Sequence, residues 1–213
     1  MITEQQFQTF IEQAHRVGKE SLQLCSSGNI SWRVDENIAL VSGTGSWLGN
    51  LKKEQIAVCE ISTKNHIDGA KPSMESTFHL GVLCERNDVN VVLHVQSEYA
   101  TIISCMKDKP MDFNVTAEIP CCCGKDIPVV PYFRPGSLEL ANAVVDAMKN
   151  HDCILLSQHG QVVCGKNFDD AFQKAVFFEM ACQIIVGAGK GNYLTLSEEE
   201  IKDLEVYVLG KKQ

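Results

Sequence analysis

The chain has 213 residues, of which 45% are apolar and 22% are charged, ordinary proportions for a folded globular protein. This length suits a single domain, so we expect residues 1–213 to form one folding unit. Nineteen basic against twenty-seven acidic residues leave a net charge of −8, which argues against nonspecific binding to nucleic acid or to an anionic membrane, because both need a basic surface.

The chain also lacks the sequence signals of export. Its longest apolar runs fall short of the roughly 20 residues of a membrane span, and the polar segment Met1–Phe7 has no signal-peptide core. Ten cysteines are present without any Cys-x-x-Cys spacing, and most lie in apolar contexts where a free thiol packs as a small core residue. These features predict a cytoplasmic protein with reduced cysteines.

The spacing of apolar residues predicts many short strands alternating with helices. In chain order, we expect a helix at 3–24, strands at 29–34, 38–42 and 56–61, a helix at 72–86, a strand at 89–95, a helix at 97–106, strands at 113–119 and 127–132, a helix at 137–149, strands at 153–157 and 161–164, and helices at 168–187 and 197–206. This order predicts an α/β fold, a single domain with a central mixed β-sheet flanked by helices.

Local signals refine three of these boundaries. Ser73 and Ser137 are expected helix N-caps, because a hydroxyl oxygen can accept from a free backbone N–H at a helix start. A polar turn is expected at 65–69. The run Cys121-Cys122-Cys123 is interpreted as strand packing, since adjacent thiols do not converge easily on one ion.

Two histidines follow short apolar runs, and this position is informative. His94 lies near the end of the strand expected at 89–95, and His159 follows the strand expected at 153–157. Alternation along a strand puts Gln96 on the same side as His94. Zinc binds imidazole nitrogen readily, and catalytic sites use three protein ligands with an open position. Taken singly, either histidine is more simply a hydrogen-bonded core residue; together they favour a metal site.

Glu75 is an acidic group near this expected site. In the first turn of its helix, it is a candidate general base, metal ligand or plain helix-terminus charge. His79 lies four residues on, on the same helical face, where it could hydrogen-bond Glu75; a structural role is the simpler one. Asn29, Thr44 and Ser73 lie in turns or at a helix start, which offer the donors of an uncharged phosphate cradle, although such turns are common.

These segments, in this order, resemble the class II aldolase/adducin family over nearly the whole chain. The resemblance rests on five motifs: Ser27–Ser31, Ser42–Gly45, Lys71–Glu75, Val91–Thr101 and Ser157–Gly160. It implies a cyclic homotetramer with active sites between subunits, acting on a small phosphorylated sugar. It also implies site residues, namely Ser26, Asn29, Thr44, Gly45 and Ser73 for the substrate phosphate, His94, Gln96 and His159 for one Zn²⁺ per subunit, and Glu75 and Tyr207 for catalysis.

The chain departs from the family pattern at three places. Gln96 stands where the family has its second metal histidine, and Met74 replaces its second serine. An amide oxygen is a weaker zinc donor than imidazole nitrogen, so we expect a looser site that also accepts Mn²⁺ or Co²⁺. The loop tyrosine that serves related aldolases as proton donor is not evident near Ala117–Glu118.

By this resemblance, we expect retro-aldol cleavage of a ketose 1-phosphate, L-fuculose 1-phosphate first, to dihydroxyacetone phosphate and L-lactaldehyde. A metal-stabilised enediolate would form as the C3–C4 bond breaks, and Glu75 would protonate it. Alternatives within the family are methylthioribulose-phosphate dehydratases and pentulose-phosphate 4-epimerases, the latter usually with Asp at the position of Glu75. A further alternative is a non-catalytic, adducin-like interaction module, toward which Gln96 is a step.

Overall fold

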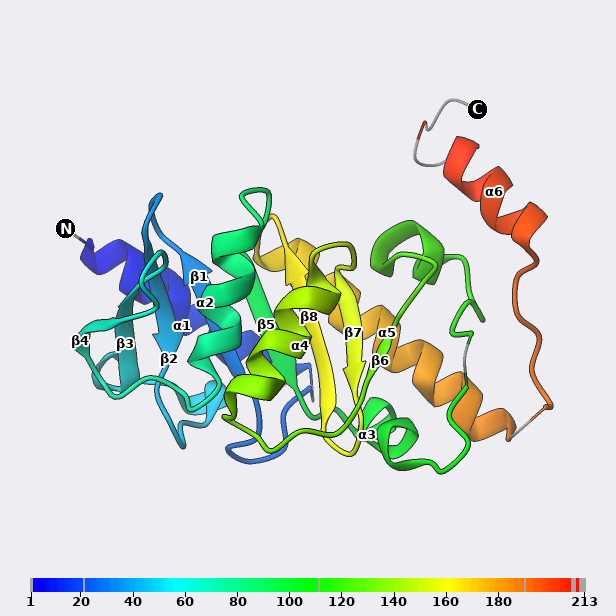
Figure 1. The fold of residues 1–213 in the computed structure, drawn as a ribbon, viewed down its shortest axis with the longest axis horizontal. Coiled ribbons are helices and arrows are strands. Elements are labelled where there is room, and N and C mark those ends of the chain that lie inside the picture. The colour runs from blue at the N-terminus through cyan, green and yellow to red at the C-terminus, as the bar shows by residue number, and fades with distance from the viewer. Residues whose placement is uncertain (1, 21, 111, 190, 208–209, 211–213) are drawn as a thin grey trace.

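The computed structural model describes residues 2–20, 22–110, 112–189, 191–207 and 210. Its centre is an eight-stranded sheet in the order β4-β3-β2-β1-β5-β8-β7-β6, with helices on both faces (Figure 1). Neighbouring strands are antiparallel, except that β6 pairs in parallel with β7. The predicted α/β fold, a mixed sheet flanked by helices, is confirmed.

Most elements follow the predicted order with adjusted ends, and the exceptions are described below. The helices are α1 (Glu4–Lys19), α2 (Ser76–Glu85), α3 (Glu98–Cys105), α4 (Leu138–Met148), α5 (Phe168–Ala188) and α6 (Glu198–Tyr207). The strands are β1 (Asn29–Arg33), β2 (Ile38–Ser42), β3 (Ile56–Glu60), β4 (His66–Gly69), β5 (Val91–Val95), β6 (Val129–Val130), β7 (Cys153–Leu156) and β8 (Gly160–Gly165). Short 3-10 turns lie at Leu48–Asn50 and Lys53–Gln55, and a π-helical turn lies at Ile119–Cys123.

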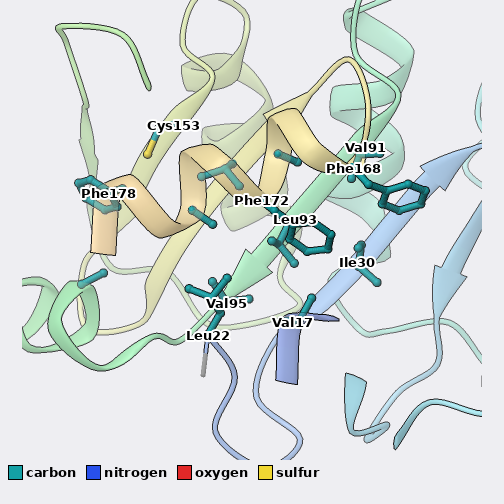
Figure 2. Close-up of a cluster of buried hydrophobic side chains, with 14 of the residues drawn as sticks. Val17, Leu22, Ile30, Val91, Leu93, Val95, Cys153, Phe168, Phe172 and Phe178 are labelled. Carbon is teal, nitrogen blue, oxygen red and sulfur yellow. The ribbon is translucent and has the colours of Figure 1, made fainter. Parts of the chain in front are cut away.

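The sheet separates two apolar cores. Helices α1, α3 and α5 cover one face and enclose the larger core, part of which is drawn in Figure 2. There Ile30 of β1 and Leu93 of β5 lie against Phe172 of α5. Helices α2 and α4 cover the other face and pack on a second cluster that includes Val92 of β5. Helices therefore cover both faces of the central strands, as expected for a layered α/β fold.

Helix α5 is the principal helix of the larger core. The side chain of Asn167 caps its start by accepting from the backbone N–H of Asp170 at 2.9 Å. Phe168, Phe172 and Phe178 lie on its buried side, at helical spacing. By length and composition α5 is apolar enough to cross a membrane, but its apolar side packs on β5 and β8, which makes it a core helix.

Strand alternation positions the polar residues that matter for function. Ile30 and Leu93 point into the larger core, so their neighbours Asn29, Ser31 and His94 point to the α2 side. In the antiparallel pairing of β1 with β5, Asn29 lies opposite His94. Three polar side chains thus meet under α2 in an otherwise apolar layer.

The start of α2 differs from the prediction. The helix begins at Ser76, with Glu75 at the N-cap position, rather than at residue 72. Ser73 is therefore not the N-cap; its hydroxyl accepts from the backbone N–H of Glu75 at 3.3 Å. Residues 71–73 instead lie against the end of β2, where the backbone N–H of Ser73 donates to the carbonyl oxygen of Ser42 at 3.0 Å.

Two predicted strand assignments are also wrong. The segment 113–119 contains no strand, and Cys121–Cys123 lie in the π-helical turn rather than in a strand. Pro120, which cannot donate to a sheet ladder, interrupts this apolar run and favours the turn. Conversely, the turn expected at 65–69 contains the edge strand β4, whose residues are all exposed and so lack an apolar pattern.

Truncating Phe178 tests the α5 core. Phe178 is fully buried and its ring contacts that of Phe113 at a centroid distance of 5.1 Å. We expect Phe178→Ala to lower the free energy of unfolding by about 3–5 kcal/mol, because it leaves a cavity in the core. Denaturant titration of both proteins measures this; Gln173→Ala, an exposed position on the same helix, should cost less than about 0.5 kcal/mol.

Candidate metal centre and active site

His94 is held in one orientation at the end of β5. Its side chain is fully buried, and its Nδ1 lies 2.8 Å from the backbone carbonyl oxygen of Gln161 on the neighbouring strand β8. Because a carbonyl can only accept, Nδ1 carries the proton and Nε2 keeps a free lone pair. A backbone partner on the second nitrogen is the usual way in which proteins orient a metal-binding imidazole.

His159 enters from the turn between β7 and β8. Its backbone N–H donates to the hydroxyl of Ser104 at 3.2 Å. The next residue is Gly160, and a Cβ there would come within 2.5 Å of the carbonyl oxygen of Val95. Only glycine allows this close approach, which presses the turn against the end of β5. The Nε2 atoms of His94 and His159 consequently lie 3.3 Å apart.

Glu75 completes the group from the start of α2. Its Oε2 lies 3.5 Å from Nε2 of His94, and its Oε1 lies 3.6 Å from Nε2 of His159. Within the part of the chain that the structure describes, these side chains gather three possible ligand atoms within 4.8 Å of one another. Three separate elements, α2, β5 and the β7–β8 turn, therefore converge on one point.

This geometry fits a divalent metal ion. Zinc binds imidazole nitrogen at about 2.0–2.1 Å in tetrahedral geometry, which corresponds to about 3.3–3.4 Å between two such nitrogens. The 3.3 Å between the two Nε2 atoms satisfies this requirement. Two imidazoles with one carboxylate are also a ligand chemistry that suits zinc and its neighbours in the first transition row.

The electrostatics of the centre keep the imidazole of His159 ready to bind a cation. Burial and the nearby His94 lower the pKa of His159 to about 4, although Glu75 opposes this shift. His159 is therefore neutral at physiological pH, the form that coordinates a metal. Burial and His94 also lower the pKa of His79 to about 3, against an opposing contribution from the backbone of Val92.

His79 does not contact the Glu75 side chain as the helical spacing suggests. Its Nε2 lies 2.5 Å from Oδ1 of Asn29, and its Nδ1 lies 2.9 Å from the hydroxyl of Ser31. Asn29 in turn donates from Nδ2 to Oε2 of Glu75 at 3.0 Å. The connection from His79 to Glu75 therefore passes through Asn29 on β1.

The predicted phosphate-binding residues lie on three segments. The loop after β2 carries Thr44 and Gly45, both exposed, and the backbone N–H of Thr44 donates to the carbonyl oxygen of Lys71 at 3.0 Å. Ser73 lies beside this loop and is buried, while Ser26 is exposed in the segment before β1. Asn29 is buried with its amide engaged by Glu75 and His79. Their roles toward phosphate stay predictions.

The structure places Tyr207 away from the cluster and Gln96 beside it. Tyr207 ends α6 and is 88% exposed. Helix α6 lies beyond the β6 edge of the sheet, away from α2 (Figure 1). Within one chain, Tyr207 therefore does not lie beside Glu75. Gln96 directly follows β5, and its Cα and Cγ each lie 3.1 Å from where a Cβ of Gly160 would stand. It is thus next to His159's turn, and its role as third ligand stays a prediction.

Sequence reasoning missed the support beneath His94. A carboxylate from the middle of α5, Glu179, accepts from the hydroxyl of Ser97 at 2.6 Å and from the backbone N–H groups of Tyr99 and Ala100 at 2.7 and 2.9 Å. This contact satisfies two of the free backbone donors at the start of α3. The side chain of Gln161 donates to the same serine at 2.7 Å. The only sequence signal was an acidic residue within an apolar helix.

Comparison with known proteins identifies relatives along most of the chain. Residues 8–186 match the family model of the class II aldolase and adducin N-terminal domain. A 3-oxo-tetronate 4-phosphate decarboxylase of Haemophilus influenzae is 31% identical over 200 residues, covering 92% of this chain and 91% of that protein. An L-fuculose phosphate aldolase of Methanococcus maripaludis is 35% identical over 159 residues, covering 75% and 84%. The crystal structure of YgbL from Klebsiella pneumoniae superposes with a TM-score of 0.87 at 28% identity, covering 96% of this chain and all of that one.

Removing one histidine tests the metal centre. We expect about one divalent metal ion per chain in the purified protein and a large loss of bound metal in His94→Ala, because the remaining imidazole and carboxylate cannot hold the ion tightly. Elemental analysis by mass spectrometry measures both. His66→Ala is the matched control, since His66 is exposed on β4, and it should keep its metal. Full metal occupancy in His94→Ala would contradict the assignment.

Proposed function

This chain belongs to the class II aldolase and adducin family, and we propose that it removes CO₂ from 3-oxo-tetronate 4-phosphate to form dihydroxyacetone phosphate. Members of its family that resemble it are metal-dependent carbon–carbon lyases, and so is this chain. The adducin-like, non-catalytic alternative has no support from these relatives. What remains to be proposed is the substrate, the metal and the role of each residue.

The reactions named for the two curated relatives share one intermediate. Loss of CO₂ from 3-oxo-tetronate 4-phosphate breaks the C1–C2 bond beside the C3 carbonyl. Cleavage of L-fuculose phosphate as an aldol breaks the C3–C4 bond beside the C2 carbonyl. Each bond cleavage leaves the same three-carbon carbanion, an enediolate, which becomes dihydroxyacetone phosphate when its carbon takes up a proton. One active site can therefore serve either reaction, and the leaving group distinguishes them.

The observation that carries the proposal is the single carboxylate beside the two imidazoles. Glu75 lies 3.5 and 3.6 Å from the Nε2 atoms of His94 and His159 and is 6% exposed. It can deliver one proton to the carbanion carbon as general acid. Decarboxylation needs no separate base, because CO₂ leaves without giving up a proton, and solvent restores the proton on Glu75 after each turnover. Aldol cleavage also requires a base for the hydroxyl of the departing aldehyde, and apart from the two proposed metal ligands the cluster of described residues contains one carboxylate.

We assign the metal to His94 and His159, with Gln96 as the third ligand. Bound there, a divalent ion supplies a Lewis acid for the carbonyl and adjacent oxygens of the substrate. Zinc is the metal that the ligand set favours, and the weaker amide oxygen of Gln96 makes Mn²⁺ or Co²⁺ acceptable. Glu75 then acts as acid and base beside the metal rather than as a permanent ligand.

The remaining protein groups bind and orient. Ser26, Asn29, Thr44, Gly45 and Ser73 form the proposed cradle for the substrate phosphate, through hydroxyl, amide and backbone donors. A site without lysine or arginine binds phosphate through such uncharged donors, which converge from several turns. We further propose a homotetramer with sites between subunits, and a cytoplasmic location, which the ten free cysteines support.

Aldol cleavage of L-fuculose 1-phosphate is the second candidate. It is favoured by the 35% identity to the Methanococcus maripaludis aldolase. In this case a second proton-transfer group has to come from a neighbouring subunit, and Tyr207, exposed at the end of α6, is the candidate. The exposure of that side chain leaves it available to a second copy of the chain.

Product assays with two substrates distinguish these functions. We expect the purified, metal-loaded protein to release CO₂ and dihydroxyacetone phosphate from 3-oxo-tetronate 4-phosphate, with a kcat/KM at least about tenfold above that for L-fuculose 1-phosphate, equivalent to about 1.4 kcal/mol. Dihydroxyacetone phosphate, the shared product, is measured by its enzyme-coupled reduction. Lactaldehyde and CO₂ are measured in separate assays. The opposite ranking would establish the aldolase, and loss of water without C–C cleavage would indicate the dehydratase.

Replacing Glu75 tests the proposed acid. We expect Glu75→Gln to lower kcat by about 10²–10⁴-fold, the usual contribution of a positioned general acid, with metal content unchanged because the two imidazoles remain. Turnover and metal analysis of the same preparation measure both. Glu85→Gln, an exposed position at the other end of α2, is the control and should match the parent. Unchanged turnover in Glu75→Gln would remove Glu75 from the mechanism.

A further inference from the structure

Behind Glu75 lies a row of buried polar side chains that the proposed reaction does not itself require. The row runs from the hydroxyl of Ser31 to Nδ1 of His79 (2.9 Å), from Nε2 of His79 to Oδ1 of Asn29 (2.5 Å), and from Nδ2 of Asn29 to Oε2 of Glu75 (3.0 Å). Ser31 and His79 are fully buried, and the other two are 6% exposed. The row joins residues from β1 and α2 that are up to 50 positions apart.

Whether each group can donate or accept a hydrogen bond sets the direction of the hydrogen bonds in this row. The Oδ1 of Asn29 can only accept, so Nε2 of His79 must carry a proton. A neutral imidazole has one N–H, so Nδ1 accepts, and the donor is the hydroxyl of Ser31. The amide nitrogen of Asn29 then donates to Glu75. Every proton in the row therefore points toward Glu75, and the opposite direction would need both a turned Asn29 amide and a proton on Oε2.

The two oxygens of Glu75 are consequently unequal. Oε2 is occupied as an acceptor by Asn29 at 3.0 Å. Oε1 is buried and has no hydrogen-bond partner among the described residues, and it faces Nε2 of His159 at 3.6 Å. A buried carboxylate oxygen without a partner is costly, and such exceptions are frequent at catalytic positions.

Packing alone does not account for an imidazole at position 79. The ring stacks on Phe78 at a centroid distance of 4.7 Å and 17° between planes, in a layer otherwise filled by apolar side chains. A leucine or phenylalanine would fill such a space without the cost of burying two polar nitrogens. Both ring nitrogens instead have hydrogen-bond partners. The imidazole therefore fixes the direction of the hydrogen bonds in a row that ends at the Glu75 carboxylate.

We propose that His79 is a positioning residue which, with its tautomer set by Ser31, locks the amide of Asn29 so that Oε2 of Glu75 is held as an acceptor and Oε1 is the oxygen that exchanges a proton with the substrate carbon. This inference rests on the proposed role of Glu75 as acid and base. It goes beyond that role because it names the oxygen that reacts and the residues that select it.

Two substitutions at His79 separate positioning from packing. His79→Gln keeps an amide donor where Nε2 stood and can still donate to Asn29, whereas His79→Leu keeps only the apolar volume. We expect His79→Leu to lower kcat about 10²-fold with little change in KM, since a misplaced catalytic group costs about this much. His79→Gln should recover most of the loss. Metal content and melting temperature are measured for both variants.

Equal kcat values for the glutamine and leucine variants would overturn the proposal, because a merely structural role does not depend on a donor at this position. Recovery by glutamine but not by leucine supports it. If full activity persists in Glu75→Gln, the proposed function itself fails, and that result is distinct from any result at His79.

A neutron crystal structure of the unmodified protein at neutral pH provides a readout that needs neither activity nor a variant that folds. We expect a deuteron on Nε2 of His79, none on Nδ1, and the deuteron of the Ser31 hydroxyl directed at Nδ1. A deuteron on Nδ1 with Nε2 bare would overturn the proposal, because the row would then run away from Glu75.

Discussion

The antiparallel register between β1 and β5 is the constraint on which the site depends. It places Asn29 opposite His94 and Ser31 opposite Val92, and the alternation of each strand turns the polar members toward α2. A slip of β1 by one residue would turn Asn29 and Ser31 into the core under α5 and bring Ile30 out of it. The apolar core on one face therefore enforces the polar arrangement on the other. Glu75 at the start of α2 and His159 after β7 then lie next to His94, whose position this register fixes.

Much of this fold and part of this site can be predicted from the sequence. His94 and His159 are recognisable because each follows a short apolar run, and strand ends do bring both to one point. Glu75 is recognisable as a charge at a helix start. The role of His79 is not recognisable, because helical spacing predicts a contact with Glu75, while the ring is actually oriented by Ser31 of strand β1. Likewise, apolarity alone predicts a strand at Cys121–Cys123, although Pro120 disfavours one, and the folded chain forms a π-helical turn there. Patterns within one element are thus visible in sequence, and pairings between elements are not.

The choice of reaction is harder to predict than the choice of family, for a chemical reason. In the proposed reaction the residues that carry the family motifs surround the carbon that becomes a carbanion, and this carbon is common to the reactions named for the decarboxylases and aldolases that the chain resembles. The group that leaves, either CO₂ or an aldehyde, departs on the far side of the broken bond. Recognition of that group depends on side chains outside the motifs, so motif similarity constrains the chemistry at the centre more than the identity of the substrate.

The central position of β5 has a thermodynamic consequence. Its histidine belongs to a strand with paired neighbours on both sides and a core helix beneath, and the carboxylate of Glu179 ties the following helix to α5. An ion that binds the folded site and not the unfolded chain links ion occupancy to global unfolding. At a free ion concentration one hundred times the dissociation constant, this linkage adds about 2.7 kcal/mol to the stability of the whole domain. Metal availability in the cell would then influence how long this protein survives proteolysis, as well as how fast it turns over substrate.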